Sequence, residues 1–212
     1  MRATARLFDA DSHLFVFDAT VLSCEPLAGG EYAVILDRTA FFPEGGGQDA
    51  DRGTLGGVLV RDVQVSADGV ICHTLPAPLS PGAVVRGEVD AAVRLERMQC
   101  HSGEHLVSGA VYAQYGFHNV GFHLGAEDVP LDFDGVLTRE QLNGIEDTVN
   151  RYIRACLPVR AFYPAPEELA TLQYRAKLAL TENVRIVEIG DGDLLCDRCA
   201  CCAPHVRNTG EI

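Results

Sequence analysis

Two histidines stand four residues apart in the segment HSGEH, residues 101–105, with Glu104 beside the second one. On a helix this spacing places both imidazoles on one face, where they can bind a common metal ion. Near the C-terminus, the segment CDRCACCAPH, residues 196–205, holds four cysteines and a histidine. Cys201 and His205 repeat the four-residue spacing, and a thiolate together with an imidazole suits zinc. The two pairs predict a Zn²⁺ site with four ligands: His101, His105, Cys201 and His205.

Two questions about this site stay open from the sequence. Cys196, Cys199 and Cys202 follow one another with C-x2-C spacing, and together with His205 they could hold a separate structural zinc ion. Four protein ligands are also typical of a structural zinc, whereas a catalytic zinc keeps one position for water or substrate. A non-catalytic zinc module that binds a partner is therefore one candidate function.

The five letters HSGEH also match the H-x-x-E-H signature of one class of zinc peptidases. In that interpretation Glu104 is the general base and a distant glutamate completes the ligands, with Glu182 as a candidate. The peptidase hypothesis leaves Cys201 and His205 without a role. If the protein is not a peptidase, Glu104 serves either as a catalytic base or as a hydrogen-bond partner of a ligand histidine.

Composition narrows the class of protein. The chain has 212 residues, 47% of them hydrophobic, which is typical of a folded protein and not of a disordered one. The formal net charge is −13, which argues against a broad nucleic-acid-binding surface but not against a local one. We find no apolar run that spans a membrane and no signal peptide, so we expect a cytoplasmic, reducing compartment and no membrane partner. There, the eight cysteines are expected as thiols or metal ligands.

The spacing of the apolar residues changes at about residue 90, which predicts two domains, 1–90 and 91–212. The first half contains short segments rich in Val, Ile, Leu and Phe, separated by turn signals, and these predict a small β-barrel. Its expected strands are 13–24, 31–38, 58–65, 69–75 and 83–90.

The second half predicts an α+β domain. A long helix is expected over 91–115, with Asp90 as its N-cap and Gly116 as its end. Further helices are expected over 138–156, where Thr138 and Gln141 form a capping box, and over 166–180. An apolar stripe on the second helix has these members: Leu142, Ile145, Val149, Ile153 and Cys156. Strands are expected over 129–133, 157–163 and 184–189.

Three segments together resemble one known family. FFPEGGGQDADRGTL (41–55), HSGEHL (101–106) and CCAPHVRNTGEI (201–212) are similar, in this order, to motifs of the free-standing alanyl-tRNA editing proteins. These are relatives of the editing domain of alanyl-tRNA synthetase. The resemblance implies an N-terminal small β-barrel followed by an α+β editing domain with a zinc site. It also implies zinc-dependent hydrolysis of the ester that links serine or glycine to alanine-specific tRNA, and it gives the metal-ligand role to the four residues named above.

The resemblance also implies where substrate binds. The Gly-rich segment would lie near the editing pocket, with these substrate-binding candidates: Gly45, Gly46, Gly47, Gln48 and His123. On physical grounds alone, we favour a tight loop in the barrel as the role of the three glycines. Because the chain is acidic, we expect tRNA binding through a few arginines, with a shallow dependence on salt. The candidate arginines are Arg52, Arg94 and Arg97.

The chain departs from the family's pattern in three places. Family members often have Cys-Gly-Gly-Thr-His where this chain has Cys-Cys-Ala-Pro-His, at residues 201–205. They often have threonine at the position of Glu104, so the resemblance gives that carboxylate no role. The chain stops at Ile212, where the family's pattern leads us to expect a strand that continues, and this predicts a truncated C-terminal end.

Overall fold

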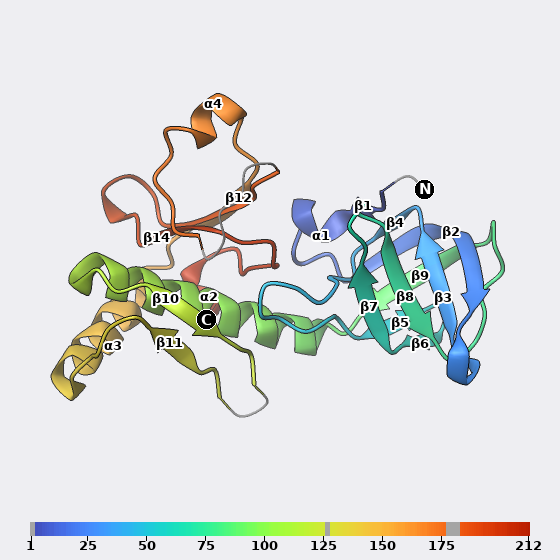
Figure 1. Ribbon diagram of the computed structural model, residues 1–212, viewed down its shortest axis with the longest axis horizontal. Coiled ribbons are helices and arrows are strands. Elements are labelled where there is room, and N and C mark those ends of the chain that lie inside the picture. Colours follow the sequence, from blue (N-terminus) through green and yellow to red (C-terminus); the bar gives the residue numbers. More distant parts are fainter. Residues whose placement is uncertain (1–2, 126–127, 177–182) are drawn as a thin grey trace. The chain divides into compact units, whose positions relative to one another are not determined.

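The computed structural model describes residues 3–125, 128–176 and 183–212 of an α+β fold (Figure 1). The chain folds into two compact units, Met1–Glu96 and Arg97–Ile212. The change from strand patterns to helical periodicity predicts a boundary slightly earlier, near residue 90. Among the described helices, none is both long enough and apolar enough to cross a membrane.

Most strands of the first unit form one antiparallel sheet of seven, in the order β6-β5-β9-β2-β3-β8-β7. The strands are as follows: β2 Val16–Pro26, β3 Tyr32–Leu36, β5 Gly53–Leu55, β6 Val58–Val60, β7 Asp62–Val65, β8 Ile71–Leu75 and β9 Val84–Val89. The short β1 (Ala5–Arg6) and β4 (Arg38–Thr39) pair in parallel beside helix α1 (Leu7–Ala10).

One bent segment nearly closes this sheet into a barrel. The two edge strands, β6 and β7, are separated in sequence only by Arg61, whose backbone N–H donates to the carbonyl of Thr74 in β8 at 2.9 Å. Alternating residues of the strands point inward and fill the interior, among them the fully buried Val34, Leu36 and Leu75. The small β-barrel expected from the sequence is therefore present as a nearly closed antiparallel sheet.

Helix α2 covers Ala91–Tyr115, the range that its sequence predicts. The Asp90 carboxylate accepts the backbone N–H groups of Ala92 and Val93, both at 3.1 Å, as an N-cap does. Gly116 follows the helix with φ of 71°, a left-handed conformation that favours glycine, and so ends it.

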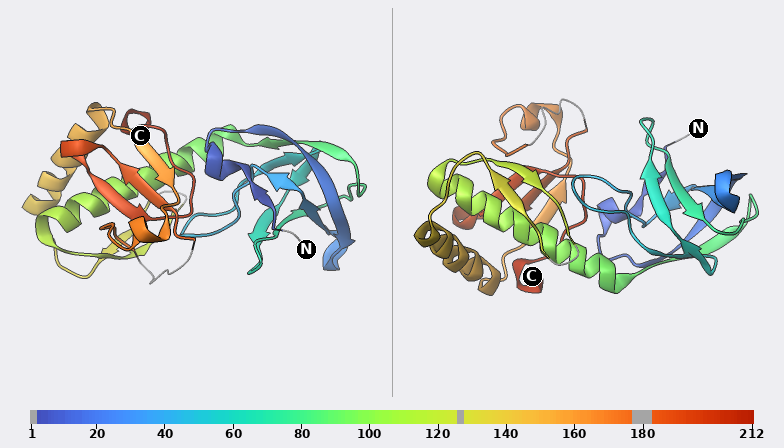
Figure 2. Two further views of the ribbon diagram at one scale, coloured as in Figure 1. Left: turned by 90° about the horizontal axis from the view of Figure 1, so that it is seen from above. Right: turned by 60° about the horizontal axis from the view of Figure 1, so that its bottom comes forward.

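The second unit packs α2 between helix α3 (Arg139–Arg154) and a sheet of order β12-β13-β14 (Figures 1 and 2). These strands are Val159–Phe162, Ile186–Ile189 and Asp197–Ala200. A buried cluster from all three elements forms the core: Leu106, Ala110, Val111, Ile145, Val149, Val187, Ile189 and Cys196. A hairpin of β10 (Asn119–Phe122) and β11 (Leu131–Phe133) follows α2.

Helix α3 agrees with its prediction at both the cap and the buried face. Thr138 and Gln141 form the expected reciprocal capping box. Ile145 and Val149 of the predicted apolar stripe are buried. Leu142 is 41% exposed, however, and Cys156 lies beyond the helix.

One predicted helix is wrong. Within the range 166–180, only α4 (Pro166–Leu169) is helical, and residues 177–180 lie outside the described structure. The chain leaves the helix because Arg175 pairs with β14: its N–H donates to Arg198 and its carbonyl accepts from Ala200, each at 2.8 Å. Two strands that were not expected from the sequence, β10 and β14, belong to the same unit.

Candidate metal centre

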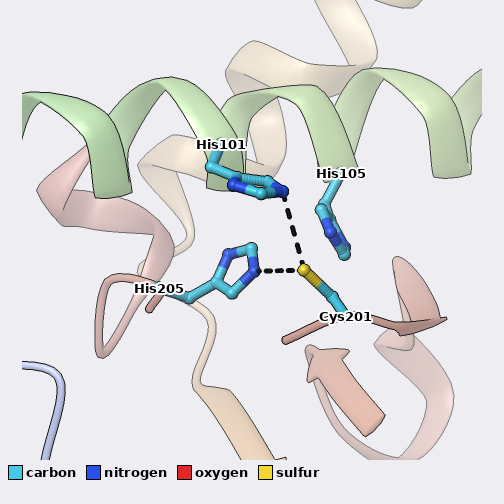
Figure 3. A group of neighbouring side chains, drawn as sticks. All are labelled: His101, His105, Cys201 and His205. Carbon is cyan, nitrogen blue, oxygen red and sulfur yellow. Dashed lines mark hydrogen bonds between the residues drawn. The ribbon is translucent and has the colours of Figure 1, made fainter. Parts of the chain in front are cut away.

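Four side chains from two distant segments converge in the second unit. The ligand atoms of His101, His105, Cys201 and His205 all lie within 4.8 Å of one another, and Figure 3 shows the four side chains pointing toward a common centre. The Cys201 Sγ atom is 3.6 Å from Nε2 of His101 and 3.4 Å from Nε2 of His205. The three imidazoles are almost fully buried. The structure therefore brings together the four residues that the sequence indicates as metal ligands.

Regular elements place both halves of this group. The 3.6-residue period of α2 puts His101 and His105 on one face. Cys201 directly follows β14, which pairs with the buried central strand β13. The loop after Cys201 is held by Arg185, whose Nη1 donates to the carbonyls of Cys201 at 3.1 Å and Ala203 at 2.8 Å. These bonds fix the path of the chain from Cys201 to His205.

Two of the imidazoles are oriented by partners that the sequence did not reveal. Asp197 Oδ2 lies 3.0 Å from Nδ1 of His105, and Arg175 donates to both oxygens of that carboxylate, at 2.7 and 2.9 Å. Ser102 Oγ lies 3.0 Å from Nδ1 of His205. In each ring the Nδ1 atom is engaged, which leaves Nε2 for the centre of the group.

The protonation states suit a bound cation. Burial raises the pKa of the Cys201 thiol, but the charge of His101 and the hydrogen bonds of His101 and His105 outweigh this effect and lower that pKa well below its usual value. Burial lowers the pKa of His205 to about 3, against the nearby charge of Cys201. Burial also acts to lower the pKa of His105, but the bonds to Asp197 and Cys201 raise it well above its usual value. A thiolate and a neutral His205 are thus ready to bind a metal, and His105 would release a proton on binding.

Glu104 lies beside the centre without joining it. It is 5% exposed, and its Oε2 atom is 3.8 Å from Nε2 of His105. Its other oxygen accepts from the Ser108 hydroxyl at 2.7 Å and from Asn119 Nδ2 at 3.1 Å. The carboxylate is therefore buried, fixed at one oxygen, and close to the ring atom that faces the metal position.

The rival cysteine arrangement is not assembled among the described residues. Only one further group of three ligand atoms is close enough there, made of His105, Asp197 and Cys199, and its carboxylate is already paired with Arg175. Burial raises the pKa of Cys199, and raises that of Cys196 to about 11, so both thiols stay protonated near neutral pH. Cys202 is exposed. The peptidase candidate Glu182 lies outside the described residues.

The Gly-rich segment forms a tight turn in the first unit. Gly45 and Gln48 exchange backbone hydrogen bonds of 3.0 and 3.1 Å around Gly46 and Gly47, whose φ angles are 62° and 83°. Positive φ at both central residues defines a two-residue hairpin turn that glycine adopts without strain. Gln48 is buried, whereas His123 follows β10 and is exposed.

Arg94 does not fit its predicted role as a tRNA contact. Its side chain is fully buried, and Nε donates to both Asp51 oxygens, at 2.9 and 3.0 Å. The guanidinium also donates to the carbonyls of Ser12 and Ala40, at 2.9 and 2.6 Å. Each of its three nitrogens is thus bonded inside the protein, so the side chain holds the segment after β4 in place and is not accessible to a phosphate.

Two family models match the chain. The model described as "tRNA synthetases class II (A)" matches residues 9–93, and the model described as "Threonyl and Alanyl tRNA synthetase second additional domain" matches residues 184–212. The second range contains Cys201 and His205. Residues 94–183, which carry His101, Glu104 and His105, lie between the two matches.

Curated relatives match almost the whole chain. It is 36% identical to the alanine–tRNA ligase of Halorubrum lacusprofundi and 37% identical to that of Ignicoccus hospitalis, over 99% of its length in each case. It is 33% identical to the alanyl-tRNA editing protein Aarsd1 of Mus musculus over 98% of its length. The chain spans 23% of either ligase and 53% of the editing protein, so it corresponds to one segment of each relative.

Proposed function

Because this chain is homologous to alanyl-tRNA editing proteins and to a segment of alanine–tRNA ligases, we propose that it is a metal-dependent hydrolase that deacylates mischarged alanine-specific tRNA. The substrate would carry serine or glycine in place of alanine, and the enzyme would act on it in trans. The convergence of His101, His105, Cys201 and His205, from segments about a hundred residues apart, carries this proposal. We expect tRNA as the partner and no interaction with a membrane.

The donor set fits Zn²⁺. Three imidazole nitrogens and one thiolate are the ligand types that zinc prefers, and the lowered pKa values of Cys201 and His205 keep both in their ligand form. Zinc bound there would supply a Lewis acid that polarises a carbonyl and makes a bound water more acidic. The protein's part is to hold the four ligands, while Asp197 and Ser102 fix the rings of His105 and His205.

Glu104 is the catalytic residue of this proposal. Its Oε2 atom lies 3.8 Å from Nε2 of His105. There it can take a proton from the attacking water and then give it to the ribose oxygen that leaves when the ester bond breaks. We assign substrate binding, on the resemblance alone, to Gly45, Gly46, Gly47, Gln48 and His123. In the hairpin turn, Gly46 and Gly47 have no side chain, so a substrate could approach their backbone groups closely.

Four protein ligands also favour a second candidate, a non-catalytic zinc module that binds tRNA or another partner. A hydrolase of this design needs a position for water or substrate beyond those four ligands. A zinc peptidase is the third candidate, and its H-x-x-E-H motif does not explain why Cys201 and His205 join the same centre.

A deacylation assay separates these candidates. Alanine-specific tRNA charged with serine or with glycine is incubated with the protein, with and without a chelator, beside a peptide substrate. We expect loss of the aminoacyl ester that stops with chelator and with His101→Ala. The matched control is His118→Ala, which removes an exposed histidine whose ring contacts Tyr112 and which lies outside the metal group. Cleavage of the peptide alone would establish the peptidase, and metal binding without any hydrolysis would establish the structural module.

A further inference from the structure

Ser108 and Asn119 form a closed hydrogen-bonded ring with Glu104. The Ser108 hydroxyl donates to Glu104 Oε1 at 2.7 Å, Asn119 Nδ2 donates to the same oxygen at 3.1 Å, and Nδ2 also donates to Ser108 Oγ at 3.1 Å. All three side chains are buried. The ring joins two elements, because Glu104 and Ser108 lie one turn apart on α2 and Asn119 begins β10.

The ring leaves the second oxygen of Glu104 turned toward the metal centre. Both donors bind Oε1, while Oε2 lies 3.8 Å from Nε2 of His105. Since Nδ1 of His105 is held by Asp197, Nε2 is the atom that faces the metal position. The two donors therefore determine which oxygen of Glu104 faces that position, and at what angle.

The Asn119 amide acts through its nitrogen. Its Oδ1 atom is buried and has no hydrogen-bond partner in the described structure, while its amide nitrogen donates to Glu104 and Ser108. A buried amide oxygen that accepts no hydrogen bond from the protein does not stabilise the fold. An apolar side chain of similar size would fill the same space, so the amide is best explained by what its nitrogen does for Glu104.

We propose that Ser108 and Asn119 are positioning residues for the reaction, holding Glu104 so that Oε2 meets the attacking water. This proposal rests on the proposed ester hydrolysis. Neither residue belongs to the four-ligand group, and both lie outside the ranges that the two family models match. Their effect should therefore pass through Glu104 and leave metal binding unchanged.

A double-mutant cycle tests this route. Asn119→Leu removes the amide at similar volume, and we expect kcat to fall about tenfold or more with KM changed less than about twofold. Glu104→Gln is expected to lower kcat by roughly 10²-fold or more, as loss of a general base does. In the Glu104→Gln background, Asn119→Leu should have little further effect, because groups that act through one another are not additive.

Ser108 gives a second and independent variant. Ser108→Ala should lower kcat as Asn119→Leu does, and Ser108→Thr, which restores a hydroxyl, should recover part of the loss. Metal content per chain should match the wild type in all of these variants. The control is Gln114→Ala, which removes an exposed amide from the same helix. This amide makes only a long hydrogen bond, of 3.4 Å, to the Thr148 hydroxyl. The control variant should leave kcat unchanged.

The possible failures are distinguishable. An equal loss of kcat from Asn119→Leu in the wild-type and Glu104→Gln backgrounds would show that Asn119 does not act through Glu104. Loss of metal from Asn119→Leu and Ser108→Ala would show a structural role instead. Full activity in both variants overturns this inference alone, whereas a wild-type protein that does not deacylate either tRNA overturns the proposed function with it.

Discussion

Asp197 and His105, far apart in sequence, are joined by a 3.0 Å hydrogen bond between Oδ2 of the carboxylate and Nδ1 of the ring. Arg175 holds the same carboxylate through both of its oxygens. Burial acts to raise the pKa of Asp197, but the bonds to His105 and Arg175 lower it below its usual value, so the group is a carboxylate. A charged acceptor at Nδ1 fixes the tautomer of His105 and makes its Nε2 a stronger metal ligand.

Replacing Asp197 should therefore weaken metal binding. We expect Asp197→Asn to lower zinc affinity about 10- to 100-fold, measured by competition with a chromophoric chelator. The matched control is Glu188→Gln on the neighbouring strand, an equally buried carboxylate held by Arg160 and Arg198 and outside the metal group. Unchanged affinity in Asp197→Asn, or an equal loss in Glu188→Gln, would remove this role.

Cys201 and Cys202 are neighbours in sequence with different expected effects. Cys201 lies in the four-ligand group, and Cys202 is exposed and outside it. We expect Cys201→Ala to abolish binding of the one zinc ion expected per chain, and Cys202→Ala to leave it unchanged, by elemental analysis after dialysis. If Cys202→Ala or Cys199→Ala loses the metal while Cys201→Ala keeps it, the rival cysteine arrangement is correct.

Local signals explain what the sequence predicted well. Helix α2 has both a capping carboxylate at Asp90 and a glycine at its end, and its histidines share a face through helical periodicity alone. Either ligand pair is encoded within five residues. From the sequence, the convergence of the two pairs could be inferred only from the types of ligand and from the family resemblance. The distances between the four ligand atoms come from the structure alone.

Long-range pairing accounts for what the sequence did not predict. The helix expected over 166–180 gives way where Arg175 pairs with β14, a strand whose residues Asp197–Ala200 have no apolar alternation. Asp197 and Asn119 lie outside the helix that carries His105 and Glu104, the two side chains to which they are hydrogen-bonded. Ser108 alone had a local signal, because it lies four residues after Glu104 on one helix.

His73 in the barrel should make stability depend on pH. It is fully buried, with Nδ1 3.2 Å from the carbonyl of Val34 and Nε2 2.9 Å from the Thr39 hydroxyl. The Thr39 oxygen in turn accepts the Phe41 N–H at 3.1 Å. The network suits a neutral ring that donates to Val34 and accepts from Thr39. Burial lowers the pKa of His73 to about 4, against the bond to Val34.

The sign of the effect follows from that shift. Between pH 6.5 and 4 the unfolded state binds a proton that the folded state does not, so stability is complete above pH 6.5 and falls with pH. We expect a loss of about 3 kcal/mol at about pH 4 relative to about pH 7 from this group. Chemical denaturation of the wild type and of His73→Gln at several pH values in this range isolates the contribution of His73 to the free energy of unfolding. A pH dependence that is the same in both proteins would contradict the prediction.

The hairpin turn at Gly46 and Gly47 gives a prediction that depends on backbone alone. Both residues have positive φ, where a residue with a Cβ is strained by about 1–2 kcal/mol. Gly46→Ala or Gly47→Ala should therefore lower the free energy of unfolding by about that amount. Gly144 in α3 is the matched control, because a Cβ there meets nothing within 4 Å and alanine favours a helix by about 1 kcal/mol.

Gly144→Ala should accordingly stabilise the protein while the two turn variants destabilise it, in the same denaturation series. The turn variants also test the assignment of this segment to substrate binding. If the turn contacts the aminoacyl end of the tRNA, they should raise KM for deacylation by more than their loss of stability explains, at a temperature where all variants are folded. An unchanged KM in folded turn variants would leave Gly46 and Gly47 with the conformational role alone.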